Sequence, residues 1–111
     1  MNHLEGLENL AGNNAKLGGA IPETMQSFVA FTGTVFKDGA LSVKQKELIT
    51  LGIAVAVRCE GCIEFHTKKC IEVGVTKEEF AEAVAVAIAM GGGPSTVYGG
   101  KALEAFEQFT K

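Results

Sequence analysis

The chain has 111 residues, of which 47% are hydrophobic and 21% are charged, and its formal net charge is −3. This composition excludes a disordered chain, because disordered segments contain few apolar residues. The negative charge argues against nucleic acid or an anionic membrane as a partner, since both attract basic surfaces. The length predicts a single domain over residues 1–111. A chain of this size that is so apolar is expected to bury surface between identical subunits.

The first ten residues, MNHLEGLENL, lack the basic segment and the apolar run of a signal peptide. The longest apolar stretch, LITLGIAVAV, is too short to span a bilayer. These features predict a cytoplasmic protein without a membrane partner. In a reducing cytoplasm, a C-x-x-C pair is usually catalytic or metal-binding rather than structural.

In chain order, the sequence predicts a loose opening segment over residues 12–19 (GNNAKLGG) and then a series of helices. Pro22 suits the first turn of a helix that ends near Asp38 and Gly39. The next helix is expected over residues 42–57, because it opens with the capping-box pattern S-x-x-Q. The sequence therefore predicts two consecutive helices between Pro22 and residue 57.

The second half of the chain continues this pattern. A helix that begins at Cys59 or Glu60 is expected to end at Gly74, a natural residue after a helix C-terminus. A second capping box, T-x-x-E, opens the helix at 77–90. That helix is apolar on nearly every face, so we expect it to be enclosed, partly by other subunits.

The sequence GGGP at 91–94 ends this helix, and the last helix is expected to run to about Phe109. No run alternates with the period of a strand for long enough to outweigh the helix signals. The predicted fold class is all-α, with about five to six helices.

The chain has three cysteines and two histidines, and three of these residues fall within the single stretch CEGCIEFH at 59–66. A helix advances about 100° per residue, so Cys59, Cys62, His66 and Cys70 lie within an arc of roughly 80°. The concentration of these residues on one helical stripe requires an explanation by packing, by metal binding or by redox chemistry.

Packing is the simplest of these explanations. Ile63 shares the stripe, so the stripe is expected to face the core, whereas Glu60 and Glu64 project to the other side and are expected in solvent. Buried cysteine behaves as a small hydrophobic residue, and for Cys70, which has no local partner, we expect packing alone. His3 lies in a terminal segment and is given no role.

The pair of Cys59 and Cys62 favours a redox dithiol. Residues three apart on a helix are neighbours, so the two sulfurs can form a disulfide. The N-terminus of a helix stabilises a thiolate. His66, one turn beyond Cys62, can accept the thiol proton. A thiolate, a resolving thiol and a base are then all present.

A metal site is the main local alternative. Tetrahedral zinc needs four converging ligands, but Cys59 and Cys70 are separated by about 16 Å along one helix. A site shared between subunits remains open, whereas this chain alone is expected to hold no metal or other cofactor. A thioredoxin-like site is disfavoured, because the C-x-x-C follows a helix rather than a strand.

Glu47 becomes a candidate by its position in the second turn of the preceding, largely apolar helix. If the helix of the motif folds back antiparallel after Arg58, Glu47 lies within about a turn of His66. A carboxylate there could orient the imidazole or relay a proton. A solvated glutamate near a helix start is an equally open interpretation.

Taken together, Glu47, Cys59, Cys62 and His66 match the pattern E-x11-C-x-x-C-x-x-x-H. With this pattern, KQKELITLGIAVAVRC before it and the MGGGP break after it, the chain resembles the AhpD-like alkylhydroperoxidases of the carboxymuconolactone decarboxylase superfamily. The similarity extends over about residues 20–108. The resemblance implies a short, all-helical AhpD-like subunit that assembles into homo-oligomers, as trimers or hexamers.

By this resemblance, Cys62 is the peroxidatic cysteine, which a hydroperoxide oxidises to sulfenic acid, and Cys59 condenses with it to form the disulfide. His66 and Glu47 form the proton relay. A dithiol protein or carrier reduces the disulfide again. Gly61 departs from the best-known members, which are longer and have a histidine at this position, so the substrate and the peroxidase rate stay open.

Three other interpretations remain. A general disulfide reductase needs the same dithiol. A lactone decarboxylase of the same superfamily would share the fold but is expected to lack the cysteine pair. A structural oligomer that binds metal predicts stoichiometric metal and thiols that resist oxidation. The sequence does not identify the hydroperoxide, the reductant or the order of the oligomer.

Overall fold

The computed structural model describes residues 2–111, and this part of the chain is all-helical, as predicted, with no strand. The fold contains six helices, which are α1 (His3–Ala20), α2 (Pro22–Val35), α3 (Val43–Ala56), α4 (Glu60–Glu72), α5 (Lys77–Gly91) and α6 (Gly93–Phe109). No helix among the described residues combines the length and the apolar character that crossing a membrane requires.

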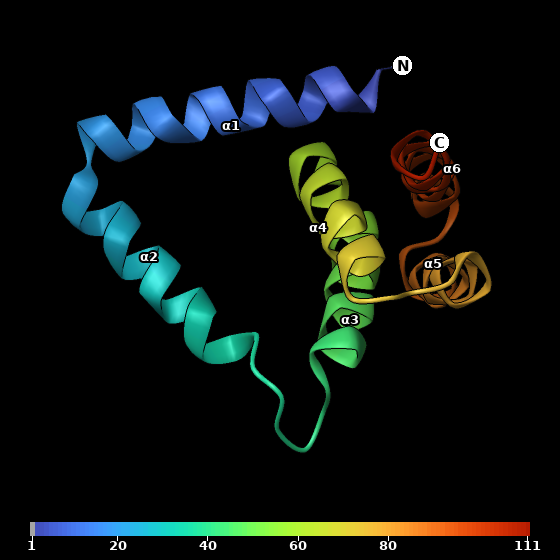
Figure 1. The fold of residues 1–111 in the computed structure, drawn as a ribbon. Helices are drawn as coiled ribbons and strands as arrows, with labels where there is room; N and C mark the ends of the chain where they lie inside the picture. Colours follow the sequence, from blue (N-terminus) through green and yellow to red (C-terminus); the bar gives the residue numbers. More distant parts are fainter. Residues whose placement is uncertain (1) are drawn as a thin grey trace.

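Helices α3 to α6 form the packed bundle. Helix α3 packs against α4 and α5, and α6 packs against the same two helices from another side. Helix α1 crosses one end of this bundle, where it contacts α4 and α6 (Figure 1). Large apolar side chains from these helices make the core, among them Leu51, Val55, Ile63, Phe80 and Phe106. Their removal from water is the main contribution to the stability of the fold.

Both predicted capping boxes are present and set the starts of α3 and α5. Ser42 accepts from Gln45 N at 3.1 Å, and Ser42 N donates to the Gln45 side chain at 2.8 Å. In the same way, Thr76 Oγ1 accepts from Glu79 N at 3.1 Å, and Thr76 N donates to the Glu79 carboxylate at 2.8 Å. The Thr76 N–H lowers the pKa of Glu79, because it donates to the carboxylate. These pairs satisfy N–H groups that a helix start leaves without partners.

The predicted loose opening segment is wrong, because residues 12–19 lie within α1. The helix begins at a side-chain cap, where Asn2 Oδ1 accepts from Leu4 N and Glu5 N at 3.1 Å. Its start is also held by contacts with α4 and α6. The capped and anchored start supplies the costly nucleus of the helix, and elongation from it needs no further nucleation.

Helices α1 and α2 form an arm that stands apart from the bundle over most of its length (Figure 1). Helix α2 packs mainly against α1 and has no buried residue. Phe28, Val29 and Phe31 of α2 are exposed by 58%, 63% and 62% of their surface. The arm therefore presents an apolar face that this chain alone does not cover.

Helix α5 is only partly enclosed within the chain. Val86 and Met90 are exposed by 66% and 84%, although Phe80 and Ala87 on the same helix are buried. An open apolar hollow of about 400 Å³ is lined by residues of α3 and of the exposed side of α5. The expectation that other subunits cover this exposed surface of α5 stays a prediction.

Candidate active site

The turn between α3 and α4 places the C-x-x-C pair at the start of a helix. Cys59 N donates to Ala54 O at 3.1 Å, and Arg58 N donates to Val55 O at 3.2 Å. These two bonds close α3 in the manner of a Schellman motif, which needs one residue with positive φ. Arg58 occupies that position with φ 62°, where glycine is usual. The sharp reversal makes α4 run back beside α3.

Cys59 is the N-cap residue of α4 and is joined to Cys62 by a disulfide. Their Cα atoms are 5.2 Å apart, which is within the range for this bond. The Cys62 N–H also lies 3.2 Å from Cys59 Sγ. A sulfur at this position receives the positive potential and the unpaired N–H groups of the helix start, which stabilise a thiolate after reduction.

The two cysteines differ in their exposure to solvent. Cys59 is half-buried, whereas Cys62 is exposed. The prediction that the whole cysteine stripe faces the core is therefore wrong at Cys62, although Ile63 and Cys70 are buried as expected. Cys62 is therefore the residue of the pair that lies at the surface of the chain.

His66 and Glu47 meet as the antiparallel arrangement of α3 and α4 predicts. The His66 Nδ1–H donates to Glu47 Oε1 at 2.7 Å, and the side chain of Glu47 is only 5% exposed, against 19% for His66. The interpretation of Glu47 as a solvated glutamate is therefore wrong. The bond engages Nδ1 of the ring, and the preceding turn of the same helix carries Cys62.

Two aromatic rings border the imidazole. Phe36, from the connection between α2 and α3, stacks on His66 with 5.7 Å between centroids and 27° between planes. Phe65 meets the same ring at 81°, with 5.0 Å between centroids. The sequence does not indicate Phe36 as a site residue, because a connecting segment carries no periodic signal that would place its side chain.

Cys70, the third cysteine, behaves differently from the pair. It is fully buried, and its S–H donates weakly to Glu47 O at 3.6 Å. Burial, together with the charge of Glu47, raises the pKa of the Cys70 thiol to about 12. A thiol that stays protonated is a poor nucleophile, so this residue fills space beside the site.

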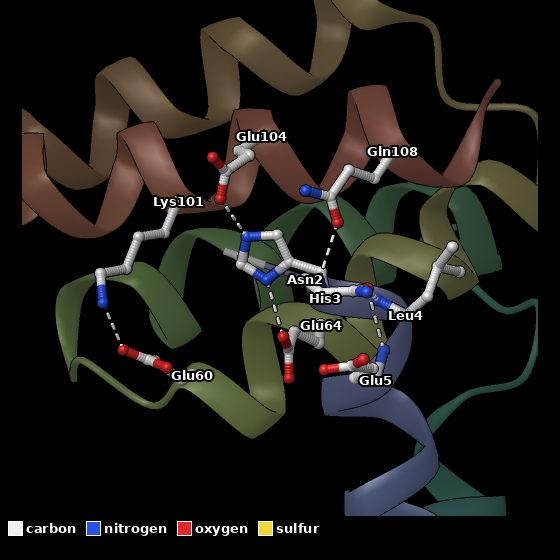
Figure 2. A network of polar contacts seen from close by, with 9 residues as sticks. All are labelled: Asn2, His3, Leu4, Glu5, Glu60, Glu64, Lys101, Glu104 and Gln108. Atoms are coloured by element: carbon white, nitrogen blue, oxygen red, sulfur yellow. Dashed lines mark hydrogen bonds and ion pairs between the residues drawn. The ribbon is translucent and has the colours of Figure 1, made fainter.

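The expectation that Glu60 and Glu64 face solvent is wrong for Glu64, which is 7% exposed. Its carboxylate contacts the imidazole of His3, which is itself 1% exposed and so does have a structural role. Glu60 is half-buried and pairs with Lys101 of α6, and this hydrogen bond raises the pKa of Lys101. Figure 2 shows how these side chains tie α1, α4 and α6 together.

The described residues, from position 2 onward, contain no group of three or more histidine, cysteine, aspartate or glutamate side chains placed to hold a metal ion. In the oxidised pair, each sulfur of Cys59 and Cys62 is already bonded to the other. The chemistry that this site offers through its own residues is thiol–disulfide chemistry assisted by an imidazole and a carboxylate.

The sequence profile of the carboxymuconolactone decarboxylase family matches residues 22–107. An uncharacterized protein of Cupriavidus necator is 40% identical over 91 residues, which are 82% of this chain and 80% of that protein. A nitrosuccinic acid decarboxylase of Metarhizium robertsii is 37% identical over 65 residues, which are 59% of this chain and 46% of that protein.

Two solved structures share the fold. A carboxymuconolactone decarboxylase family protein from Legionella pneumophila superposes with a TM-score of 0.95 at 41% identity, covering 98% of this chain and 97% of its own. A Thermotoga maritima member of that family, described as "possibly involved in antioxidative response", superposes with a TM-score of 0.81 at 26% identity. It covers 92% of this chain and 90% of its own.

Proposed function

The chain belongs to the carboxymuconolactone decarboxylase family, and from this membership and its dithiol site we propose that it is a thiol-dependent peroxidase of the AhpD-like type. It reduces a hydroperoxide to an alcohol through a cycle of dithiol and disulfide, and so serves antioxidant defence. The observation that carries the proposal is the exposed Cys62, paired with Cys59 and followed by an imidazole that a buried carboxylate orients.

In the first step, the Cys62 thiolate attacks the terminal oxygen of the hydroperoxide. The O–O bond breaks, the alcohol leaves with a proton from His66, and Cys62 becomes a sulfenic acid. In the second step, Cys59 attacks the sulfenic sulfur, water leaves, and the disulfide forms. A dithiol protein or carrier then supplies two electrons and two protons to restore both thiols.

The two acid–base residues act at named atoms in this scheme. His66 Nε2 takes the proton of the Cys62 thiol and returns it to the alkoxide that leaves. Glu47 accepts the Nδ1–H at 2.7 Å, and we propose that this bond orients the ring so that Nε2 serves the reacting sulfur. Its burial keeps water from competing for this bond.

The test follows the thiols directly. Reduced protein, with a chelator present, is treated with one equivalent of an organic hydroperoxide, quenched by alkylation and mapped by peptide mass spectrometry. We expect a rapid Cys59–Cys62 disulfide in the wild type and in Cys70→Ser, which removes the third thiol as a control. Cys59→Ser should stop at the sulfenic acid. Thiols that oxidise no faster than free cysteine would overturn the proposal.

The same experiment separates the peroxidase from a general disulfide reductase, which needs the same dithiol. A reductase would oxidise slowly with the hydroperoxide and rapidly with a protein disulfide. The decarboxylase from Metarhizium robertsii favours a second candidate, a lyase. Substrate-dependent release of carbon dioxide that survives Cys59→Ser and Cys62→Ser would establish that activity in place of the peroxidase.

A homo-oligomer, as a trimer or hexamer, is the proposed state of the protein. The apolar face of α2 and the hollow between α3 and α5, with Val86 and Met90 at its edge, are the surfaces that a second copy would cover. Light scattering of the wild type should give a multiple of the 11.6 kDa chain. Met90→Glu should lower that mass, because it places a charge in the apolar contact.

A further inference from the structure

The connection between α2 and α3 enters the active site through one side chain. Phe36 is half-buried and lies against one face of the His66 ring, with 5.7 Å between centroids. It ends α2, and its N–H donates to Thr32 O at 3.1 Å. The arm formed by α1 and α2 thus reaches the candidate relay at the point where it rejoins the bundle.

Lys46 holds the backbone on both sides of Phe36. Its Nζ donates to Val35 O at 2.8 Å and to Lys37 O at 2.6 Å, the carbonyls that flank the aromatic residue. A cation at the C-terminus of a helix is also favoured by the partial negative charge there. The position of Phe36 is therefore set from α3.

The same helix holds His66 in a second way. Glu47, the next residue after Lys46, accepts the hydrogen bond from His66 Nδ1 at 2.7 Å. One hydrogen bond leaves a ring free to tilt about the axis of that bond, whereas a stacked ring opposes the tilt. Two consecutive residues of α3 thus restrain the imidazole. Glu47 holds its Nδ1 by a hydrogen bond, and Lys46 holds the backbone of Phe36, which stacks on the face of the ring.

We propose that Phe36, held by Lys46, is a positioning residue for His66. The stack fixes the plane of the imidazole, so that Nε2 stays directed toward the turn that carries Cys62. The expected effect on the rate of Cys62 oxidation rests on the proposed function, whereas the contact itself can be tested without any peroxide. The proposal also gives a role to the C-terminal end of α2, which otherwise makes few contacts with the bundle.

The contact is tested by NMR of the histidine side chains. The chain has only two histidines, and His3 lies at the far end of the arm, so its ring serves as an internal reference. Phe36→Ala should move the His66 ring signals, because the ring current of the stacked phenyl is lost, and should leave those of His3 in place. His66 signals that do not move would overturn the proposal.

The consequence is tested on the reduced protein by the rate of disulfide formation and by the pH profile of Cys62 alkylation. Phe36→Leu keeps an apolar side chain of similar reach but no ring, and Phe36→Tyr keeps the ring. We expect Phe36→Leu to slow disulfide formation about tenfold, because misplaced groups lose orientation, and to move the alkylation profile to higher pH. Phe36→Tyr should restore both.

Lys46→Met should act in the same direction as Phe36→Leu. Lys44→Met is its matched control, because Lys44 lies on the same helix and pairs with Glu79 at 3.0 Å, away from the site. If Phe36→Leu and Phe36→Tyr behave alike, the contact is packing and the proposal fails. If the wild type forms no disulfide with hydroperoxide, the proposed peroxidase function is wrong. The His66 ring signals and the alkylation of Cys62 then still decide the role of Phe36.

Discussion

The two histidines of this chain are both hydrogen-bonded to carboxylates at 2.7 Å, yet their surroundings differ. His66 is bonded through Nδ1 to Glu47, and its side chain is 19% exposed. His3 is bonded through Nδ1 to Glu64 and through Nε2 to Glu104, and its side chain is 2% exposed (Figure 2). The His66 ring is therefore bonded to a carboxylate through one nitrogen, whereas the His3 ring is bonded to carboxylates through both.

This difference teaches how to separate a relay from a structural link. A histidine that exchanges protons needs one nitrogen to be oriented and one to be accessible. His3 has neither nitrogen to spare, and its backbone N–H is also used, in a bond to Gln108 at 2.7 Å. Its bonds join residues that are 61 and 101 positions apart in the sequence, so its role is to fasten the start of α1 to α4 and α6.

The largest expected effect is on the proposed relay of His66 and Glu47. His66→Ala should slow hydroperoxide-dependent formation of the Cys59–Cys62 disulfide by about a hundredfold, because general acid–base assistance at Cys62 is lost. His3→Gln should change the rate by less than about twofold, since Gln retains hydrogen-bonding groups and lies outside the site. Stopped-flow oxidation with alkylation of the remaining thiols measures both. Equal losses in the two variants would erase the distinction between the histidines.

The structural link should show in stability instead. His3→Ala is expected to lower the free energy of unfolding by about 2 kcal/mol, because it leaves the buried Glu64 without its partner. Urea unfolding followed by circular dichroism measures the change. Glu104→Gln is the milder control, since the Glu104 side chain is 45% exposed and its amide can still accept a bond. An unaltered midpoint for His3→Ala would mean that α1 is held by other contacts.

The close approach of α1 to α4 offers a third test. Gly6 packs against the carboxylate of Glu64 so closely that an added Cβ would collide with it. Gly6→Ala should therefore lower the free energy of unfolding by about 1 kcal/mol, even though alanine favours a helix. Gly12→Ala is the matched control on the same helix, because nothing lies within 4 Å of its added Cβ, and it should raise stability slightly in the same unfolding measurement. A gain of stability in both variants would show that Glu64 moves freely.

Much of the fold could be predicted because its signals are local. The capping boxes at Ser42 and Thr76, and the reversal before α4, all lie within a few residues of the feature that they define. The meeting of Glu47 with His66 followed from two antiparallel helices of known rise per residue. These features need only the geometry of a helix and of its ends.

The features that the sequence did not predict depend on contacts between distant elements. The helical projection assumed that α4 has a single buried face, and it therefore placed Glu64 in solvent. Helix α4 instead packs against α3 on one side and against α1 and α6 on others, so a carboxylate is buried opposite the cysteine stripe and pairs with His3. The stacking of Phe36 on His66 is likewise a contact between elements that are distant in the sequence.

The smallest expected effect concerns Cys70 and uses pH rather than a rate. Burial raises the pKa of its thiol from an ordinary value of 9.0 to about 12. The folded protein therefore binds one more proton than the unfolded chain between these two values, and its stability falls as the pH rises above 9. Between pH 8 and pH 10 the loss is about 1 kcal/mol.

Cys70→Ala should abolish this slope. The comparison is made in a background of Cys59→Ser and Cys62→Ser, so that no other thiol titrates, and the free energy of unfolding is measured at both pH values. The mutation also removes buried volume, which lowers stability by a similar amount at every pH and so leaves the slope as the readout. This experiment distinguishes Cys70 from the Cys59–Cys62 pair, as the first two predictions distinguish His3 from His66. A slope that survives Cys70→Ala would belong to another group, whereas its loss would show that the third cysteine is a buried, protonated packing residue.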